Sequence, residues 1–139
     1  DPMYPIDLVK PMENELLQAG FESLTDEQEV EQALNDKSGT MLLMVNSVCG
    51  CAAAHARPGV AMALKSSKIP EKLYTVFAGV DREATAKARE FLAPYPPSSP
   101  SIALFKDGEL VHMIERYQIE GRNADIVAAN LKMAFDTYC

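Results

Sequence analysis

The sequence predicts an α/β domain in which helices cover both faces of a central, mixed β-sheet. Residues 41–46 form an apolar run without polar alternation, which is typical of a strand buried on both faces. From this strand onward, strand and helix patterns occur in the order β-α-β-α-β-β-α. A β-α-β crossover unit is thus followed by a β-hairpin and a helix. The 139 residues suffice for one proper core. We therefore expect a single domain over 1–139, with a helical extension over 1–38 and the α/β core over 40–139.

Two helices are expected ahead of the first strand. The first covers 5–19 and ends at Gly20, because glycine commonly follows the last residue of a helix. Pro11 inside this segment predicts a kink or a later start. The second helix covers 25–36, and its first residues, Thr25-Asp-Glu-Gln28, resemble a capping box.

Helix and strand alternate after the first strand. An alanine-rich helix pattern runs over 50–67, and Pro58 should kink it because proline lacks a backbone N–H. Residues 73–78 predict the second strand. We expect Asp81 to cap the next helix, over 82–92.

A hairpin and a final helix complete the expected fold. Residues 101–106 and 109–114 predict antiparallel strands, because Asp107-Gly108 between them is a strong signal for a two-residue turn. Asn123 is expected to cap a helix that reaches the C-terminus. One face of this helix should be apolar, formed by Ile126, Val127, Leu131, Ala134 and Phe135.

Charge and cysteine content exclude several classes of protein. The net charge of −7 disfavours nucleic acid and anionic membranes as partners. No apolar run approaches the roughly 20 residues of a membrane span, and the chain shows no secretory signal at its start. An odd count of 3 cysteines argues against a disulfide-stapled secreted domain and predicts a cytoplasmic protein. Nothing in the sequence indicates an oligomeric state.

The chemistry is expected at Cys49-Gly50-Cys51, where the first strand gives way to a helix. Free N–H groups at the start of a helix favour the thiolate, which is the nucleophilic form of cysteine. Gly50 keeps the turn small and can adopt backbone angles that other residues avoid. A disulfide across one residue has little slack, because preferred Cα separations are about 5.5 Å. These features predict a redox-active pair in which Cys49 is the nucleophile.

Further residues carry a resemblance to known proteins. Pro58 stands where thioredoxins have a helix-kinking proline, and Pro100-Ser-Ile-Ala-Leu-Phe-Lys-Asp-Gly-Glu109 resembles the thioredoxin strand that begins with a cis-proline. A closer similarity covers nearly the whole chain and is carried by the segments 46–54, 56–58, 76–79, 81 with 83–87, 98–101 and 119–121. These segments resemble the bacilliredoxin family.

This resemblance implies a thioredoxin-like fold and a thiol–disulfide oxidoreductase. It implies that Cys49 attacks a protein–bacillithiol mixed disulfide, releases the reduced protein and retains bacillithiol, which free bacillithiol or Cys51 then removes. The implied partners are S-thiolated or disulfide-bonded proteins. Bacillithiol is the implied co-substrate, and no bound cofactor is needed. Pro100, with Ser99 before it, is implied to shape the substrate groove, and Gly50 is a further candidate for substrate binding.

Arg57 has two interpretations. Its guanidinium could bind the carboxylates of the malyl group of bacillithiol in a bidentate manner. It could equally be a solvated or salt-bridged side chain. Residues 117–121 are expected on a loop, and the family resemblance suggests that this loop lies near the active face.

Departures from thioredoxin leave other functions open. There is no Trp, and Leu43 stands where thioredoxins have a buried Asp for proton transfer, so a thioredoxin-like reductant is not expected. A general protein disulfide isomerase or oxidase is one alternative. A non-enzymatic metal-binding module is another, in which Cys49 and Cys51 would need further ligands from His55, His112 or Cys139.

Overall fold

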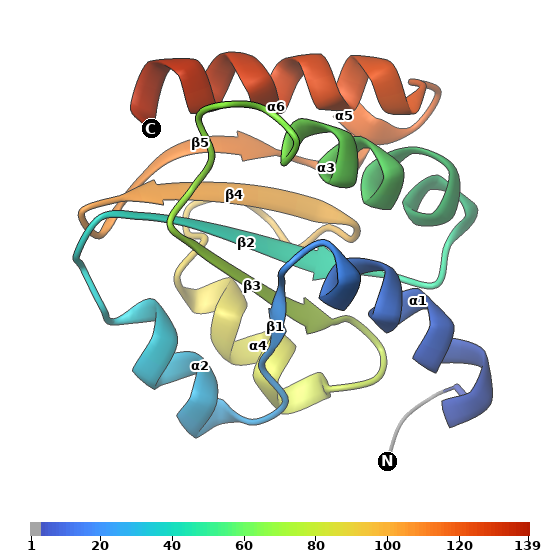
Figure 1. The fold of residues 1–139 in the computed structure, drawn as a ribbon. Coiled ribbons are helices and arrows are strands. Elements are labelled where there is room, and N and C mark those ends of the chain that lie inside the picture. The colour runs from blue at the N-terminus through green and yellow to red at the C-terminus, as the bar shows by residue number, and fades with distance from the viewer. Residues whose placement is uncertain (1–3) are drawn as a thin grey trace.

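A five-stranded mixed sheet runs through the middle of the molecule (Figure 1), in a computed structural model that describes residues 4–139. The strand order is β1-β3-β2-β4-β5. β3 lies parallel to both β1 and β2, whereas β4 lies antiparallel to β2 and to β5. The strands are β1 (Glu22–Ser23), β2 (Thr40–Asn46), β3 (Lys72–Phe77), β4 (Ser101–Lys106) and β5 (Glu109–Ile114).

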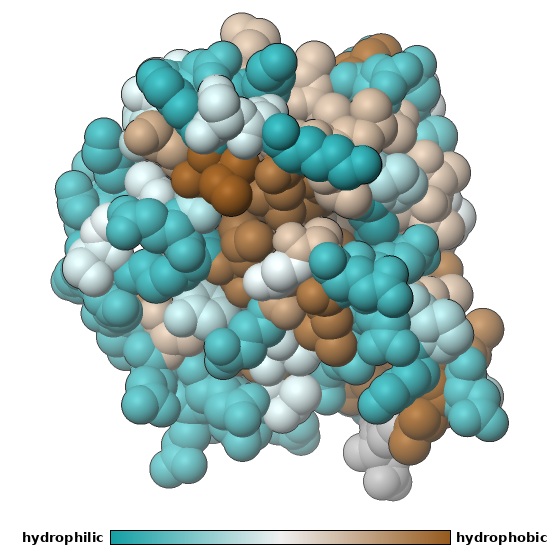
Figure 2. Space-filling view, viewed as in Figure 1, coloured by the Kyte–Doolittle hydropathy of each residue, from teal (hydrophilic) through white to brown (hydrophobic). Residues whose placement is uncertain are grey.

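Helices cover both faces of this sheet, as the sequence predicts. α1, α3 and α6 lie on one face, and α2 and α4 lie on the other (Figure 1). The helices are α1 (Ile6–Gln18), α2 (Glu27–Leu34), the π-helical turn η1 (Ala52–Ala56), α3 (Arg57–Ala63), α4 (Arg82–Glu90), α5 (Arg116–Ile119) and α6 (Ala124–Tyr138). None of the helices between residues 4 and 139 is long and apolar enough to cross a membrane. On the face seen in Figure 2, hydrophobic residues gather near the middle and hydrophilic residues surround them.

β2 is the strand from which the active-site segment emerges, and it is buried along its whole length. Leu42 and Met44 pack with α3 and α6 in one apolar core, while Leu43 and Val45 pack with α2 and α4 in the other. This division explains why the strand has no polar alternation. It also gives β2 a firm position between two cores.

The predicted helix over 50–67 is interrupted. It begins with the π-helical turn η1 and continues as α3, with Pro58 at the second position of α3. Proline lacks an N–H and its ring crowds the carbonyl group four residues earlier. The wider π-helical turn before Pro58 accommodates both constraints.

Helix capping differs from the prediction at two helices. The N-cap of α2 is Asp26, one residue after the predicted Thr25, and its carboxylate accepts the Glu29 N–H at 2.8 Å. Asp81 stands at the N-cap of α4, but its side chain makes no capping hydrogen bond. Burial, followed by the charges of Glu13 and Glu29, raises the pKa of Asp81 to about 6.

At the C-terminal helix, the cap is confirmed and the apolar face is partly wrong. The Asn123 side chain accepts the Ile126 N–H at 2.9 Å, as expected. Ile126 itself is exposed, whereas Val127, Leu131 and Phe135 are buried. The hairpin at Asp107-Gly108 is also confirmed, since both residues have positive φ angles, as a tight two-residue turn requires.

Two elements were not predicted. β1 has only two residues, too few to show a strand period, and it lies in the connection between the two helices expected over 5–19 and 25–36. Residues 116–119 form the short helix α5 and not a loop. A capping box explains it: Glu115 caps the first turn, and its N–H donates to Gln118 Oε1 at 2.9 Å.

Candidate active site

The two cysteines lie where β2 ends and the following helix begins. The Cys49 carbonyl accepts the N–H groups of Ala52 and Ala53, at 3.1 and 3.3 Å. Cys49 is therefore the residue that begins the helix, and its side chain lies at the helix N-terminus. Cys51 falls in the first turn and packs partly against the core that includes α3 and α6. Both are half-buried free thiols.

The surroundings of Cys49 favour its thiolate. Burial raises the pKa of the Cys49 thiol, but hydrogen bonds from the side chains of Cys51 and Ser47 and from the Ala52 N–H outweigh it. The positive charge of Arg116 acts in the same direction. The net result is a pKa below the ordinary value for cysteine, which supplies more thiolate at neutral pH.

Cys51 has the opposite tendency. Burial raises its pKa, and donating a hydrogen bond to Cys49 and lying beside the Cys49 charge raise it further. Only one of two adjacent thiols can readily ionise, because a second negative charge so close to the first is unfavourable. The geometry therefore separates one nucleophilic thiol from one protonated partner.

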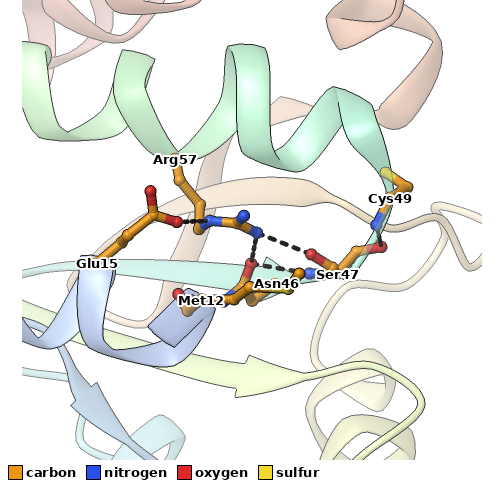
Figure 3. A network of polar contacts seen from close by, with 6 residues as sticks. All are labelled: Met12, Glu15, Asn46, Ser47, Cys49 and Arg57. Atoms are coloured by element: carbon orange, nitrogen blue, oxygen red, sulfur yellow. Dashed lines mark hydrogen bonds and ion pairs between the residues drawn. The ribbon is translucent and has the colours of Figure 1, made fainter. Parts of the chain in front are cut away.

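A buried polar network supports the segment that precedes Cys49 (Figure 3). Ser47 Oγ accepts the Cys49 N–H at 3.2 Å. The Ser47 carbonyl accepts from Arg57 Nη1 at 2.8 Å, and the Ser47 N–H donates to Asn46 Oδ1 at 2.8 Å. Asn46 Oδ1 also accepts from Arg57 Nη1, at 3.0 Å. The guanidinium thus binds the last residue of β2, Asn46, and the residue that follows it, Ser47.

Arg57 is tied on its other side to the N-terminal helix. Its Nε forms an ion pair with Glu15 of α1, and Asn46 Nδ2 donates to the Met12 carbonyl of the same helix at 3.3 Å (Figure 3). The Arg57 side chain is only 2% exposed and the Glu15 side chain is 50% exposed. Of the two interpretations of Arg57, the structure favours the salt-bridged one, because its donors point into the protein and not toward a substrate.

The Ser99–Pro100 peptide bond is cis, as the resemblance implies. Ser101, the first residue of β4, pairs with Val45 of β2. Because Val45 lies at the end of β2, this register brings the Ser99–Pro100 peptide beside the segment that carries Cys49. Pro100 is buried and Ser99 is half-buried. The Ala93–Pro94 bond is also cis, which was not predicted.

Arg116, at the start of α5, is the functional candidate that the sequence did not reveal. Its Nη1 donates to the Ser99 carbonyl at 3.1 Å, and its backbone N–H donates to Ser98 Oγ at 3.4 Å. Its charge acts on both Cys49 and Cys51. It therefore joins the cis-proline segment to the cysteine pair. Only its position in the sequence could have indicated a role for Arg116, because it directly precedes residues 117–121, which the resemblance suggests lie near the active face.

Gly50 does not have the backbone role expected of it. Its φ is not among the positive values found at other glycines, and a Cβ built on Gly50 meets no atom within 4 Å. Gly50 is exposed, and the space where a side chain would stand at this position is open.

Other predicted features are located as follows. Leu43 is fully buried among apolar residues. The Cys139 thiol lies close to Thr40 and Lys106, at the end of the sheet opposite to Cys49. Among residues 4–139, no group of three or more His, Cys, Asp or Glu side chains is arranged to hold a metal ion. Within that range, Cys49 and Cys51 therefore have no third ligand.

The pH dependence of Cys49 should reveal its supporting hydrogen bonds. We expect the pKa of Cys49 in Cys51→Ser to lie below the free value of about 8.5, because the serine hydroxyl can still donate to the sulfur. Cys51→Ala removes this donor and should raise the pKa. Thiolate absorbance against pH measures both values. Equal pKa values in the two variants would contradict the role of the Cys51 hydrogen bond.

Comparison with known proteins identifies close relatives. A family model described as disulphide isomerase matches residues 4–139. A bacilliredoxin of Cytophaga hutchinsonii is 60% identical over 134 residues, which cover 96% of this chain and 98% of the relative. A bacilliredoxin of Staphylococcus epidermidis is 52% identical over 137 residues, which cover 99% of this chain and 94% of the relative.

Solved structures share the fold at much lower identity. The thioredoxin of Fasciola hepatica aligns with a TM-score of 0.58 at 17% identity, covering 86% of this chain and 100% of the thioredoxin. The mitochondrial thioredoxin 3 of Saccharomyces cerevisiae aligns with a TM-score of 0.54 at 16% identity, covering 84% and 94% of the two chains. A thioredoxin fold with a free cysteine pair at a helix start defines a thiol–disulfide oxidoreductase. With the relatives above, the chain belongs to the bacilliredoxin family.

Proposed function

We propose that this oxidoreductase removes bacillithiol from proteins that carry it as a mixed disulfide, and that it does so in the cytoplasm. The observation that carries the proposal is the asymmetry of the cysteine pair, in which the pKa of Cys49 is lowered and that of Cys51 is raised. A single activated thiolate suits attack on a mixed disulfide. Relatives named bacilliredoxin support bacillithiol as the small thiol.

In the proposed reaction, the Cys49 thiolate attacks the bacillithiol sulfur of the mixed disulfide. The protein–bacillithiol S–S bond breaks as the Cys49–bacillithiol S–S bond forms, and the target leaves as a thiolate that takes a proton from water. A second thiol must then release bacillithiol from Cys49. Free bacillithiol can attack the bacillithiol sulfur of the adduct, which forms bacillithiol disulfide and releases the Cys49 thiolate. Alternatively, Cys51 attacks the Cys49 sulfur, which forms a Cys49–Cys51 disulfide and releases bacillithiol as a thiolate.

Substrate binding is proposed at the surface between Gly50 and the Ser99–Pro100 peptide. Gly50 is exposed, with open space where a side chain would stand. The Ser99–Pro100 peptide lies beside the Cys49 segment by strand register. We further propose that residues 1–139 act as one unit, since Glu15 of the N-terminal helix pairs with Arg57 under the active-site segment.

The proposed function is tested with a peptide whose single cysteine carries bacillithiol as a mixed disulfide. We expect the protein to release the free peptide thiol and to gain the mass of bacillithiol on Cys49, located by proteolysis and mass spectrometry. Free bacillithiol should then restore the unmodified enzyme. A peptide that stays modified, or an adduct in which the peptide itself remains on Cys49, would reject this reaction.

A second candidate is general disulfide isomerisation, favoured by the match to the disulphide isomerase family model. It predicts that the protein reactivates a scrambled, multiply disulfide-bonded test protein without any small thiol. The same enzyme preparation should be used in both assays. Faster reactivation than removal of bacillithiol, at equal substrate concentration, would favour isomerisation.

A further inference from the structure

The Arg116 guanidinium is held beside the cysteine pair from two sides. On one side it donates to the Ser99 carbonyl of the cis-proline segment at 3.1 Å. On the other it forms an ion pair with Glu120, one turn further along the chain. The capping box at Glu115 and Gln118 defines the short helix on which Arg116 stands. These contacts orient the side chain without burying it, because 43% of its surface remains exposed.

Part of this guanidinium remains free to bind a ligand. A guanidinium has five N–H donors, and only the Nε and Nη1 groups of Arg116 donate to other residues within the part of the chain that the structure describes. The other three N–H groups, two of them on Nη2, are available to donate to a carboxylate. Arg57 cannot do this, because its side chain is buried against Glu15, Asn46 and Ser47.

The charge of Arg116 also stands out against its surroundings. The chain carries a net charge of −7, which repels small anions at long range. Arg116 supplies positive charge close to both sulfurs, where it favours the Cys49 thiolate. An anionic thiol approaching Cys49 would therefore meet a cation at the site of attack and an acidic surface elsewhere.

We propose that Arg116 binds the carboxylate of the small thiol while Cys49 attacks its sulfur, and so makes the site selective for anionic over neutral thiols. This inference rests on the proposed function and deepens it, since it names the charge class of the transferred thiol and the residue that recognises it. The recognition leaves the exchange reaction unchanged. The Cys49 thiolate still forms one S–S bond to the small thiol, and the peptide still leaves as a thiolate.

The test compares two probes that differ in charge. One peptide cysteine is joined to mercaptosuccinate, which carries two carboxylates, and in the second probe the same cysteine is joined to 2-mercaptoethanol, which is neutral. The leaving peptide is therefore identical. The rate of peptide release in the first turnover is measured for both probes, and mass spectrometry verifies that the small thiol is transferred to Cys49. The ratio of the two rates is the readout, because a change in Cys49 reactivity alone moves both rates together.

Arg116→Gln should lower the mercaptosuccinate-to-mercaptoethanol ratio about tenfold, since hydrogen bonds to charged groups contribute on this scale. Arg116→Lys keeps the positive charge but lacks the paired, planar N–H donors of a guanidinium, and it should give an intermediate ratio. Arg122→Gln is the matched control, because it changes net charge equally at an exposed position nearby. It should leave the ratio unchanged. Added salt should reduce the ratio in the native protein more than in Arg116→Gln.

The outcomes separate this inference from the proposed function. If Arg116→Gln slows both probes equally, or slows neither, Arg116 does not recognise the thiol and the inference is wrong, while the transfer reaction stands. An equal loss of selectivity in Arg122→Gln would also overturn it, because any cation would then serve. A native protein that transfers mercaptosuccinate no faster than 2-mercaptoethanol would overturn it as well, whereas the proposed function fails only if the native protein leaves bacillithiol on the modified peptide. Retained activity on 2-mercaptoethanol shows that Arg116→Gln is folded.

Discussion

Cys49→Ser is expected to abolish removal of bacillithiol from a modified peptide, with a loss of roughly a thousandfold or more. The serine hydroxyl is not ionised at neutral pH, so the helix N-terminus and the hydrogen bonds from Ser47 and Ala52 have no thiolate to stabilise. Cys51→Ser should instead retain the first step and release about one peptide per enzyme molecule. Quantification of peptide thiol in the first turnover measures both effects.

The later turnovers of Cys51→Ser then define the role of the second cysteine. If free bacillithiol resolves the adduct, turnover continues at a rate that rises with bacillithiol concentration. If Cys51 resolves it, the variant stops after one turnover. Cys139→Ser is the matched control, since Cys139 lies at the opposite end of the sheet, and it should behave as the native protein. A Cys51→Ser variant that releases no peptide would mean that Cys51 and not Cys49 is the nucleophile.

The parts of the fold that could be predicted are those whose cause is local. β2 reads as a doubly buried strand because consecutive residues, such as Leu42 and Leu43, face two different cores. The hairpin follows from Asp107-Gly108, whose backbone angles few other pairs adopt easily. Two-residue β1 has no such signal, because its place in the sheet comes only from pairing with β3.

In the candidate site, too, the residues that could be predicted are those with a local sequence signal. Cys49 and Cys51 are recognisable because the strand-to-helix change is visible in the sequence. The environments of the two arginines depend on residues distant in the chain: Arg57 pairs with Glu15, and Arg116 donates to Ser99. Sequence patterns alone therefore left both interpretations of Arg57 open and did not draw attention to Arg116. Asp81 is locally suited to capping, but its side chain makes no capping hydrogen bond at α4, and the local sequence does not indicate this.

Arg57→Met is expected to lower the free energy of unfolding by about 2 kcal/mol, because it removes a buried guanidinium that donates to two buried acceptors. The Ser47 carbonyl and Asn46 Oδ1 would each lose a buried donor. Urea unfolding measures this change. Lys87→Met is the comparison variant: it removes a cation that pairs with Glu31 and Glu90 and whose side chain is 22% exposed, against 2% for Arg57. It should cost less than about 1 kcal/mol.

The same substitution should also affect chemistry at Cys49. Ser47 hydrogen-bonds the Cys49 sulfur and lowers its pKa, and Arg57 binds the Ser47 carbonyl. Without Arg57, we expect the Cys49 pKa to rise, so that the alkylation rate reaches its plateau at higher pH. Arg57→Lys provides a second variant if Arg57→Met does not fold, because it keeps the charge but not the paired donors. An unchanged pH profile in a destabilised variant would restrict Arg57 to holding the fold, whereas a shifted profile makes it a positioning residue for the nucleophile.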